Sequence, residues 1–287
     1  MTDIPDDLVG RLASKQLILF VGAGVSMALG LPSYAQLIRE IGEQVGYDGQ
    51  IFEGFGDYLT LAEYYHHEKN GLLELQRYLQ QAWKKTRQEV LKSPVHHAIA
   101  ELDCRLIYTT NFDSFIEQAH RGLGRRYRTI RSAKDLVDLS DERVHIVKLH
   151  GDLTSPTTMV FTESSYFERL SFESPLDLKL RTDAIGKSVL FIGYSLSDIN
   201  VRYLLFRLQR QWEREFRPEL RPKSYVFMGR PNPVQARVLE HRGVRTIVGD
   251  TPDQAEALAS FLRELKTRAD GYVVPSSSAN RGGRGTG

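Results

Sequence analysis

Cysteine is almost absent from this chain, since Cys104 is the only one among its 287 residues. A single thiol excludes disulfide bonds within the chain and any zinc site built from four cysteines. This sparse use of cysteine is typical of proteins from a reducing, intracellular compartment. Long apolar runs are also missing, because no segment approaches the roughly 18 residues that a membrane-spanning helix needs. We therefore expect no membrane partner.

Neither sign of charge predominates. The chain has 38 lysines and arginines against 36 aspartates and glutamates, which gives a formal net charge of +2. That balance is too even to indicate a nucleic-acid or membrane partner from charge alone. The first residues, MTDIPDDLVGRL, are acidic where a signal peptide would be basic, and no apolar core follows them. We expect a soluble protein of the cytoplasm.

The most informative stretch is QLILFVGAGVSMALGLPSY, from Gln16 to Tyr34. Its first part is apolar and long enough for one buried strand, after which Gly22 and Gly24 precede a segment that can begin a helix. In α/β proteins this arrangement brings a strand end and a helix N-terminus to a phosphate, and glycine keeps Cβ atoms away from the phosphate. A plain strand-to-helix turn has the same pattern, so the two glycines alone decide nothing.

Short apolar strands alternate with helical patterns along most of the chain. This alternation predicts a doubly wound, mainly parallel α/β sheet. Residues 46–57 are predicted to be a loop, and residues 120–131 a β-hairpin or loop. Strands are expected at 17–21, 104–109, 144–149, 188–192, 223–228 and 244–248, and helices at 34–45, 114–120, 162–180, 199–216 and 255–265.

Two segments stand apart from this alternation. Residues from about 48 to 96 carry helical patterns without a strand signal, which predicts a helical insertion or subdomain. The end of the chain, PSSSANRGGRGTG (275–287), has no apolar periodicity and is predicted to be a disordered tail. The remaining residues, 1–274, are assigned to one catalytic domain that includes the insertion.

Polar motifs directly follow four of the expected strands. Ligands of open α/β sheets bind beyond the carboxyl ends of the strands, so these motifs should meet in one crevice. They are Gly22-Ala23-Gly24, Asn111-Phe112-Asp113, His150-Gly151-Asp152 and Gly193-Tyr194-Ser195.

Each of these polar residues has both a functional and a structural interpretation. Asn111 could bond a ribose hydroxyl or a water, or it could form an Asx turn, and Asp113 could equally cap the next helix. His150 could be a general base near neutral pH, or a turn histidine bonded to a carbonyl. Ser195 could donate to a phosphate or cap a helix.

Three other chemistries are disfavoured by the sequence. In a dinucleotide fingerprint the third glycine would fall at Met27, and the acidic residue expected about 20 positions later is missing, which argues against a dehydrogenase. No G-x-S-x-G elbow supports a serine hydrolase built on Ser26 or Ser195. The adjacent histidine pairs, 66–67 and 96–97, lack metal-ligand spacing.

Five motifs resemble, in order, the NAD-binding motifs of sirtuin-like proteins: GAGVS (22–26), GLP (30–32), TNFD (110–113), LHG (149–151) and GYSL (193–196). The resemblance implies a Rossmann-like fold that cleaves the bond between nicotinamide and ribose. It implies that Asn111 positions the ribose and a water, and that His150 is the catalytic histidine acting on the ribose hydroxyls. The contacts to NAD⁺ that it implies are Gly22, Ala23, Gly24, Ser26, Asp113, Gly193 and Ser195.

Departures from the sirtuin deacylases refine this expectation. Those enzymes have a four-cysteine zinc ribbon, and they read Gly-Ile-Pro-Asp-Phe-Arg where this chain has GLPSYA (30–35). The chain is more similar to the zinc-free bacterial branch, whose members hydrolyse NAD⁺ to nicotinamide and ADP-ribose, commonly in anti-phage defence. NAD⁺ would then be the substrate, with no metal. A deacylase, an ADP-ribosyltransferase and a non-catalytic NAD or ADP-ribose sensor in a larger assembly remain alternatives.

Partners other than NAD⁺ are implied by the family and not shown by the sequence. The resemblance implies a homo-oligomer or assembly with a separate sensor such as an ATPase. Arginines gather in two segments and are interpreted as solvated or protein-interface residues, with a nucleic-acid or partner-protein surface as the alternative. They are Arg125, Arg126, Arg128 and Arg131 in one segment, and Arg202, Arg207, Arg210, Arg214, Arg217 and Arg221 in the other.

Overall fold

A seven-stranded sheet with strand order β3-β4-β2-β1-β5-β6-β7 forms the centre of the computed structural model, which describes residues 2–137, 139, 143–171, 173–194, 199–215 and 222–273. Every neighbouring pair of strands is parallel, which confirms the predicted doubly wound sheet. The strands are β1 (Leu17–Val21), β2 (Leu106–Thr109), β3 (Tyr127–Ile130), β4 (Val144–Lys148), β5 (Ser188–Ile192), β6 (Ser224–Met228) and β7 (Val244–Val248).

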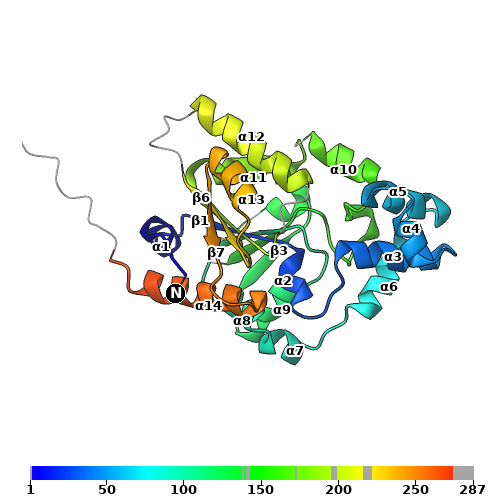
Figure 1. The fold of residues 1–287 in the computed structure, drawn as a ribbon. Helices are drawn as coiled ribbons and strands as arrows, with labels where there is room; N and C mark the ends of the chain where they lie inside the picture. Colours follow the sequence, from blue (N-terminus) through cyan, green and yellow to red (C-terminus); the bar gives the residue numbers. More distant parts are fainter. Residues whose placement is uncertain are drawn as a thin grey trace, which may run out of the picture.

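Helices cover both faces of the sheet (Figure 1). Successive residues of a strand point to opposite faces, so Leu19 and Val21 of β1 pack on one side while Ile18 and Phe20 pack on the other. The first face is covered by α1 (Asp6–Ala13), α8 (Pro94–Glu101), α9 (Phe115–Gly122) and α14 (Gln254–Asp270), and the second by α11 (Pro175–Gly186), α12 (Ile199–Glu215) and α13 (Pro233–His241).

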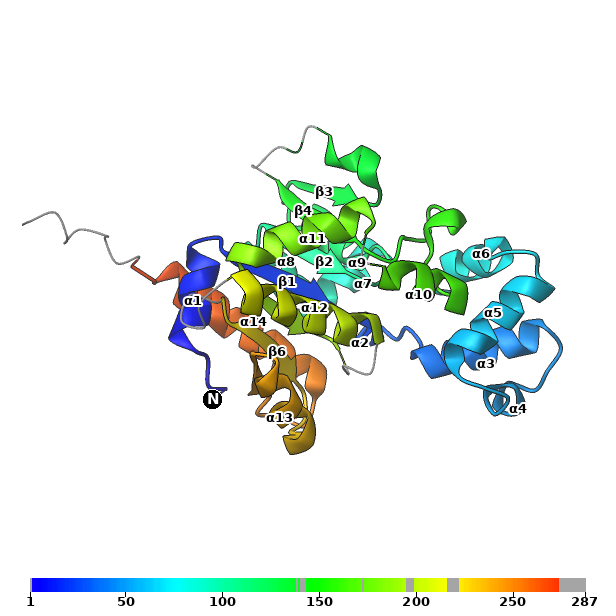
Figure 2. The ribbon, with the colours of Figure 1, turned by 90° about the horizontal axis from the view of Figure 1, so that it is seen from above.

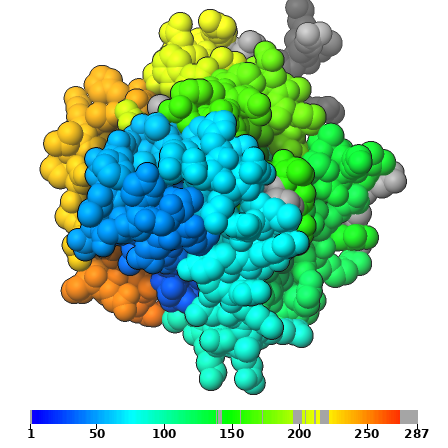
Figure 3. Space-filling view, turned by 90° about the vertical axis from the view of Figure 1, so that its right-hand side faces the viewer, coloured from blue at the N-terminus to red at the C-terminus, as the bar shows by residue number. Residues whose placement is uncertain are grey.

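A second hydrophobic core lies beside the sheet, within helices α3 to α6. Phe52, Tyr65 and Leu75 are buried there with Met159 and Phe161, which come from the segment after β4. Figure 2 shows these helices on the side toward which β1 runs, and Figure 3 shows them covering that side of the molecule in blue and cyan. The helices of this core are α3 (Tyr34–Gln44), α4 (Gly49–Glu53), α5 (Tyr58–Glu68) and α6 (Leu73–Ala82). Two short helices, α2 (Ala23–Met27) and α7 (Arg87–Lys92), lie outside it.

Helix α10 (Glu163–Leu170) joins this helical core to the rest of the chain. The backbone N and Oγ of Ser164 donate to the two carboxylate oxygens of Glu63 on α5, at 2.8 and 3.0 Å. Residues 48–96 form helices α4 to α7 and the start of α8, with no strand, as predicted. The limits of the insertion at 48 and 96, and the assignment of 1–274 to one domain, stay predictions. The predicted tail at 275–287 lies outside the described residues.

Two local predictions are wrong. Within the predicted loop, α4 forms because Asp48 Oδ1 caps its first turn, accepting from Gln50 N at 2.9 Å and Ile51 N at 3.1 Å. Within the predicted hairpin or loop, β3 pairs with β4 in parallel at the edge of the sheet. An edge strand is only half buried, so it tolerates arginines that hide its strand pattern. In the described ranges no helix is both long and apolar enough to cross a membrane.

Candidate functional site

A cavity of about 510 Å³ lies beyond the carboxyl ends of β1, β2 and β4, against the α3–α6 helices. Its size is that of a small-molecule site. The predicted residues Ser26, Asn111, Asp113 and His150 all line it, so the structure brings three of the four polar motifs to one place. The rest of the wall is mainly apolar and aromatic, and includes Leu31, Tyr34, Trp83, Phe112, Phe161 and Tyr166.

Asn111, Ser26 and Asp113 form one buried hydrogen-bond network. Asn111 Nδ2 donates to Ser26 Oγ at 2.9 Å and to the Gly22 carbonyl at 3.1 Å. Ser26 Oγ in turn donates to Asp113 Oδ2 at 2.7 Å. Asn111 Oδ1 is buried and has no hydrogen-bond partner among the described residues. A buried acceptor without a partner is costly, and this one belongs to a residue that lines the cavity.

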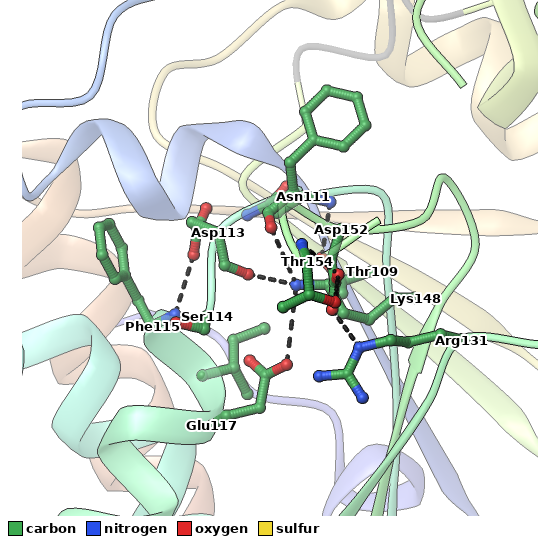
Figure 4. A network of polar contacts seen from close by, with 12 residues as sticks. Thr109, Asn111, Asp113, Ser114, Phe115, Glu117, Arg131, Lys148, Asp152 and Thr154 are labelled. Atoms are coloured by element: carbon green, nitrogen blue, oxygen red, sulfur yellow. Dashed lines mark hydrogen bonds and ion pairs between the residues drawn. The ribbon is translucent and has the colours of Figure 1, made fainter. Parts of the chain in front are cut away.

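The backbone around Asn111 is held by the end of β2. Thr109 Oγ1 donates to the Val21 carbonyl of β1 at 2.8 Å and accepts from Asn111 N at 3.0 Å. Asp113 Oδ1 accepts from Phe115 N, the first N–H of α9, at 3.0 Å, so this carboxylate holds the start of the helix and also Ser26, although the N-cap residue itself is Ser114. The structural and functional interpretations of Asp113 are therefore compatible. Figure 4 shows Thr109, Asn111 and the Asp113–Phe115 contact close to Lys148.

His150 lies two residues after the end of β4 and is almost fully buried. Its ring packs edge-on against Tyr166, with the ring centroids 5.4 Å apart. Burial, aided by the nearby Arg169 guanidinium, lowers the pKa of His150 to about 3. The imidazole is therefore neutral at physiological pH, and its basicity is lower than the general-base hypothesis assumed. Arg169 is itself paired with Asp177, at 2.5 Å.

Acid should destabilise the fold through two buried histidines. His96, like His150, has its pKa lowered by burial, to about 4. A histidine whose pKa is lower in the folded state binds its proton mainly on unfolding, so stability is lost as the pH falls from about 6.5 toward these values. Between pH 7 and 5, urea unfolding should show a loss of up to about 2 kcal/mol for each histidine.

Single variants check this assignment. His96→Gln and His150→Gln should each reduce the loss of unfolding free energy between pH 7 and 5, whereas His67→Gln, at an exposed residue, should leave it unchanged. Equal pH dependence in all three variants and the wild type would contradict the assignment.

The glycines at 22, 24 and 193 bring the end of β1 close to the end of β5. The N–H groups of Gly22 and Gly24 donate to the carbonyls of Ile192 and Gly193, both at 2.9 Å. A Cβ on Gly22 would lie 2.6 Å from the Gly193 oxygen. Space for a phosphate is thus not the only reason for glycine here, because the turn also packs against β5. Gly193 adopts φ +70°.

A second cavity, of about 380 Å³, lies on the other side of this turn. Ala23 and Ser26 of α2 line the larger cavity, while Gly24 and Val25 line the second. Its other lining residues include Gly193, Tyr194, Gly229 and Gln254. Ser195, predicted to contact NAD⁺, lies outside the described residues.

Several site residues were missed by sequence reasoning. Tyr194 lies in a motif that was recognised, yet only the structure shows its hydroxyl donating to the Val21 carbonyl at 3.2 Å and lying 2.9 Å from Thr110 Oγ1. Tyr166 belongs to a helix without any motif. Lys148 offered a usable signal, since it is the one charged residue in the apolar run before His150. No group of His, Cys, Asp or Glu suited to a metal ion occurs in the described part of the chain.

Comparison with known proteins identifies the family. Residues 105–247 match the family model described as the SIR2-like domain. The chain contains a SIR2-like domain. The matched region carries Asn111, Asp113 and His150, and thus three of the cavity's polar residues.

Curated relatives match this SIR2-like chain over longer stretches. "NAD(+) hydrolase ThsA" of Bacillus cereus (strain MSX-D12) is 30% identical over 277 residues, which are 91% of this chain and 57% of that protein. "Defense-associated sirtuin 2" of Bacillus subtilis is 24% identical over 239 residues, 81% of this chain and 23% of that protein. The chain thus spans about half, or less, of the length of the curated relatives it matches.

A solved structure described as "The Structural basis for Sirtuin Substrate affinity" aligns with this chain at 12% sequence identity and a TM-score of 0.44. The alignment covers 90% of this chain and 96% of the chain in that structure.

Proposed function

We propose that this SIR2-like chain is an NAD⁺ glycohydrolase that releases nicotinamide and ADP-ribose. The observation that carries the proposal is the buried Asn111 side chain, whose Oδ1 lacks a partner among the described residues and which lines the same cavity as His150. The relative named NAD(+) hydrolase ThsA, similar over most of this chain, supports the same activity.

The two cavities suit the two ends of a dinucleotide. In this proposal nicotinamide and its ribose occupy the larger cavity, beside Asn111 and His150, and adenosine occupies the second. The diphosphate then crosses the turn at Gly22 to Ser26, whose residues line both cavities. Aromatic walls such as Tyr34 and Phe161 can pack against a nicotinamide ring.

The proposed reaction needs positioning more than a strong nucleophile. The C–N bond between nicotinamide and ribose breaks, and nicotinamide leaves as a neutral molecule. The ribose gains oxocarbenium character, and water then attacks its anomeric carbon. Asn111 Oδ1 would orient that water or a ribose hydroxyl. A neutral His150 can accept a hydrogen bond from a ribose hydroxyl, but its low pKa makes it a weak base. The proton released from water finally passes to solvent.

We further propose that hydrolysis depletes NAD⁺ during defence against phage, in the cytoplasm. The name of the Bacillus subtilis relative, a defense-associated sirtuin, supports this setting. Assembly into a homo-oligomer, or with a separate sensor such as an ATPase, is part of the same proposal. Contact with nucleic acid has less support, because arginines such as Arg131 and Arg210 are paired with Asp152 and Glu213.

Product chromatography tests the proposal. Purified protein, alone and with any candidate activator, is incubated with NAD⁺, and nicotinamide and ADP-ribose are expected in equal amounts. Lys179→Met, at a residue outside the cavity lining, serves as a matched control and should react like the wild type. Nicotinamide release that requires an acylated peptide would indicate a deacylase, and label transfer to protein a transferase. Binding of NAD⁺ by calorimetry without any release would indicate a sensor.

A further inference from the structure

Lys148, the last residue of β4, is fully buried behind the Asn111 loop. Its ammonium group donates to the Phe112 carbonyl at 3.2 Å and to the Asp113 carbonyl at a shorter distance. Burying an ammonium group costs free energy unless the group is paired and hydrogen-bonded, so the contacts of Lys148 should explain why a lysine is present here. Figure 4 shows the side chain between β4 and the loop.

The closest partners of this ammonium are carbonyl groups of the loop and not a carboxylate. Glu117 on α9 supplies the opposite charge, but its Oε1 lies 3.6 Å from Lys148 Nζ and makes no hydrogen bond among the described residues. Glu117 and Asp152, whose pKa the Lys148 charge helps to lower, thus balance the charge, while the directed hydrogen bonds go to the backbone of residues 112 and 113. The Phe112 carbonyl also accepts from Leu153 N, at 3.2 Å.

The loop that Lys148 holds carries the side chains of the proposed reaction. Asn111 and Asp113 project from it into the Ser26 network. Lys148 fixes the 112–113 peptide group, which lies between them, and the 113–114 peptide group, which follows. A peptide group that rotates would carry the neighbouring side chains with it. We propose that Lys148 is a positioning residue, which fixes the backbone of residues 112–113 so that Asn111 meets the substrate in one orientation. The kinetic part of this inference rests on the proposed NAD⁺ hydrolysis.

A single substitution would not separate positioning from folding. Lys148→Met alone would leave the Glu117 carboxylate buried without its counter-charge. The informative set therefore uses a Glu117→Gln background, in which Lys148 is retained or replaced by Met or Gln. Met and Gln are both neutral and similar in size to lysine, but only glutamine can donate a hydrogen bond to the carbonyls. The donor is thus tested apart from the charge.

Steady-state kinetics with NAD⁺ give the first measurement. Relative to Glu117→Gln alone, adding Lys148→Met should lower kcat about 10- to 100-fold and leave KM within about threefold, because small misplacements of a positioning group affect the reacting geometry more than binding. Adding Lys148→Gln instead should restore a clear part of kcat. Equal kcat in the Met and Gln forms, or a change confined to KM, would overturn the inference.

Amide hydrogen exchange gives a second measurement that needs no activity. In the Met form, peptides covering residues 110–115 should exchange about tenfold faster, while peptides covering β1 keep their protection. Lys179→Met, which removes a partly buried lysine from a different ion pair, should change neither region. Unchanged exchange at 110–115 would overturn the inference even if NAD⁺ proves not to be the substrate. Faster exchange in the Met form, together with a wild-type protein that releases no nicotinamide, would support the positioning role and reject the proposed function alone.

Discussion

Replacing Asn111 by alanine is expected to slow nicotinamide release from NAD⁺ about 100- to 1,000-fold, the loss seen when one preorganised polar group is removed from an active site. The change removes the partner-free Oδ1 from the cavity wall and the two hydrogen bonds that Nδ2 donates to Ser26 and Gly22. Rates are measured by chromatography of nicotinamide at saturating NAD⁺, with circular dichroism as a check that the variant folds.

Asn232→Ala provides the matched control for this prediction. Asn232 caps α13 by accepting from Gln235 N at 3.0 Å, outside both cavity linings. Losing this cap should cost about 1 kcal/mol of stability and leave the rate unchanged. A rate for Asn111→Ala within about threefold of the wild type would remove Asn111 from the proposed reaction.

Gly151→Ala is expected to lower the free energy of unfolding by roughly 3 kcal/mol or more, among the largest effects of a single substitution. Gly151 follows His150 and adopts φ +75°, and a Cβ added there would lie 2.1 Å from the Thr158 carbonyl oxygen. That contact is with backbone, so the segment between His150 and Thr158 must move. Urea unfolding at constant pH measures the change, and nicotinamide release should fall as His150 is displaced.

Gly124→Ala separates the two causes of this loss. Gly124 has a similar φ, +66°, but an added Cβ would meet nothing within 4 Å. It should therefore cost only the conformational penalty of a left-handed residue, about 1–2 kcal/mol. Equal losses at the two positions would show that contact with Thr158 contributes little.

Most of the sheet could be predicted because its strands are apolar and lie between helical patterns. β1 is an example, since all five of its residues are buried and apolar. The strand β3 escaped prediction because it lies at the edge, where Arg128 is tolerated on a half-exposed strand. The short helix α4 depends on the cap by Asp48 and on burial of Phe52 in the second core, which is a tertiary contact that no local pattern reveals.

The identity of the polar residues at the site could be predicted from the sequence, but their protonation and contacts could not. Strand ends and motif order pointed to Asn111 and His150, and the structure places both at one cavity. The pKa of His150 depends on how deeply the ring is buried and on Arg169, which is 19 positions away in the sequence and meets it only in the fold. The role of Lys148 likewise depends on a contact between the end of β4 and the loop after β2.

The position of β1 has a consequence for how the chain acquires its structure. Ile18 pairs with Leu106 on one side and Leu17 pairs with Ser188 on the other, so the central strand has its second neighbour only after most of the chain has been made. Contacts so distant in sequence slow folding, and until β5 is available one apolar edge of β1 remains without a partner. A nascent chain that pauses before residue 188 would thus present an aggregation-prone edge, and its dependence on chaperones should be greatest at that length.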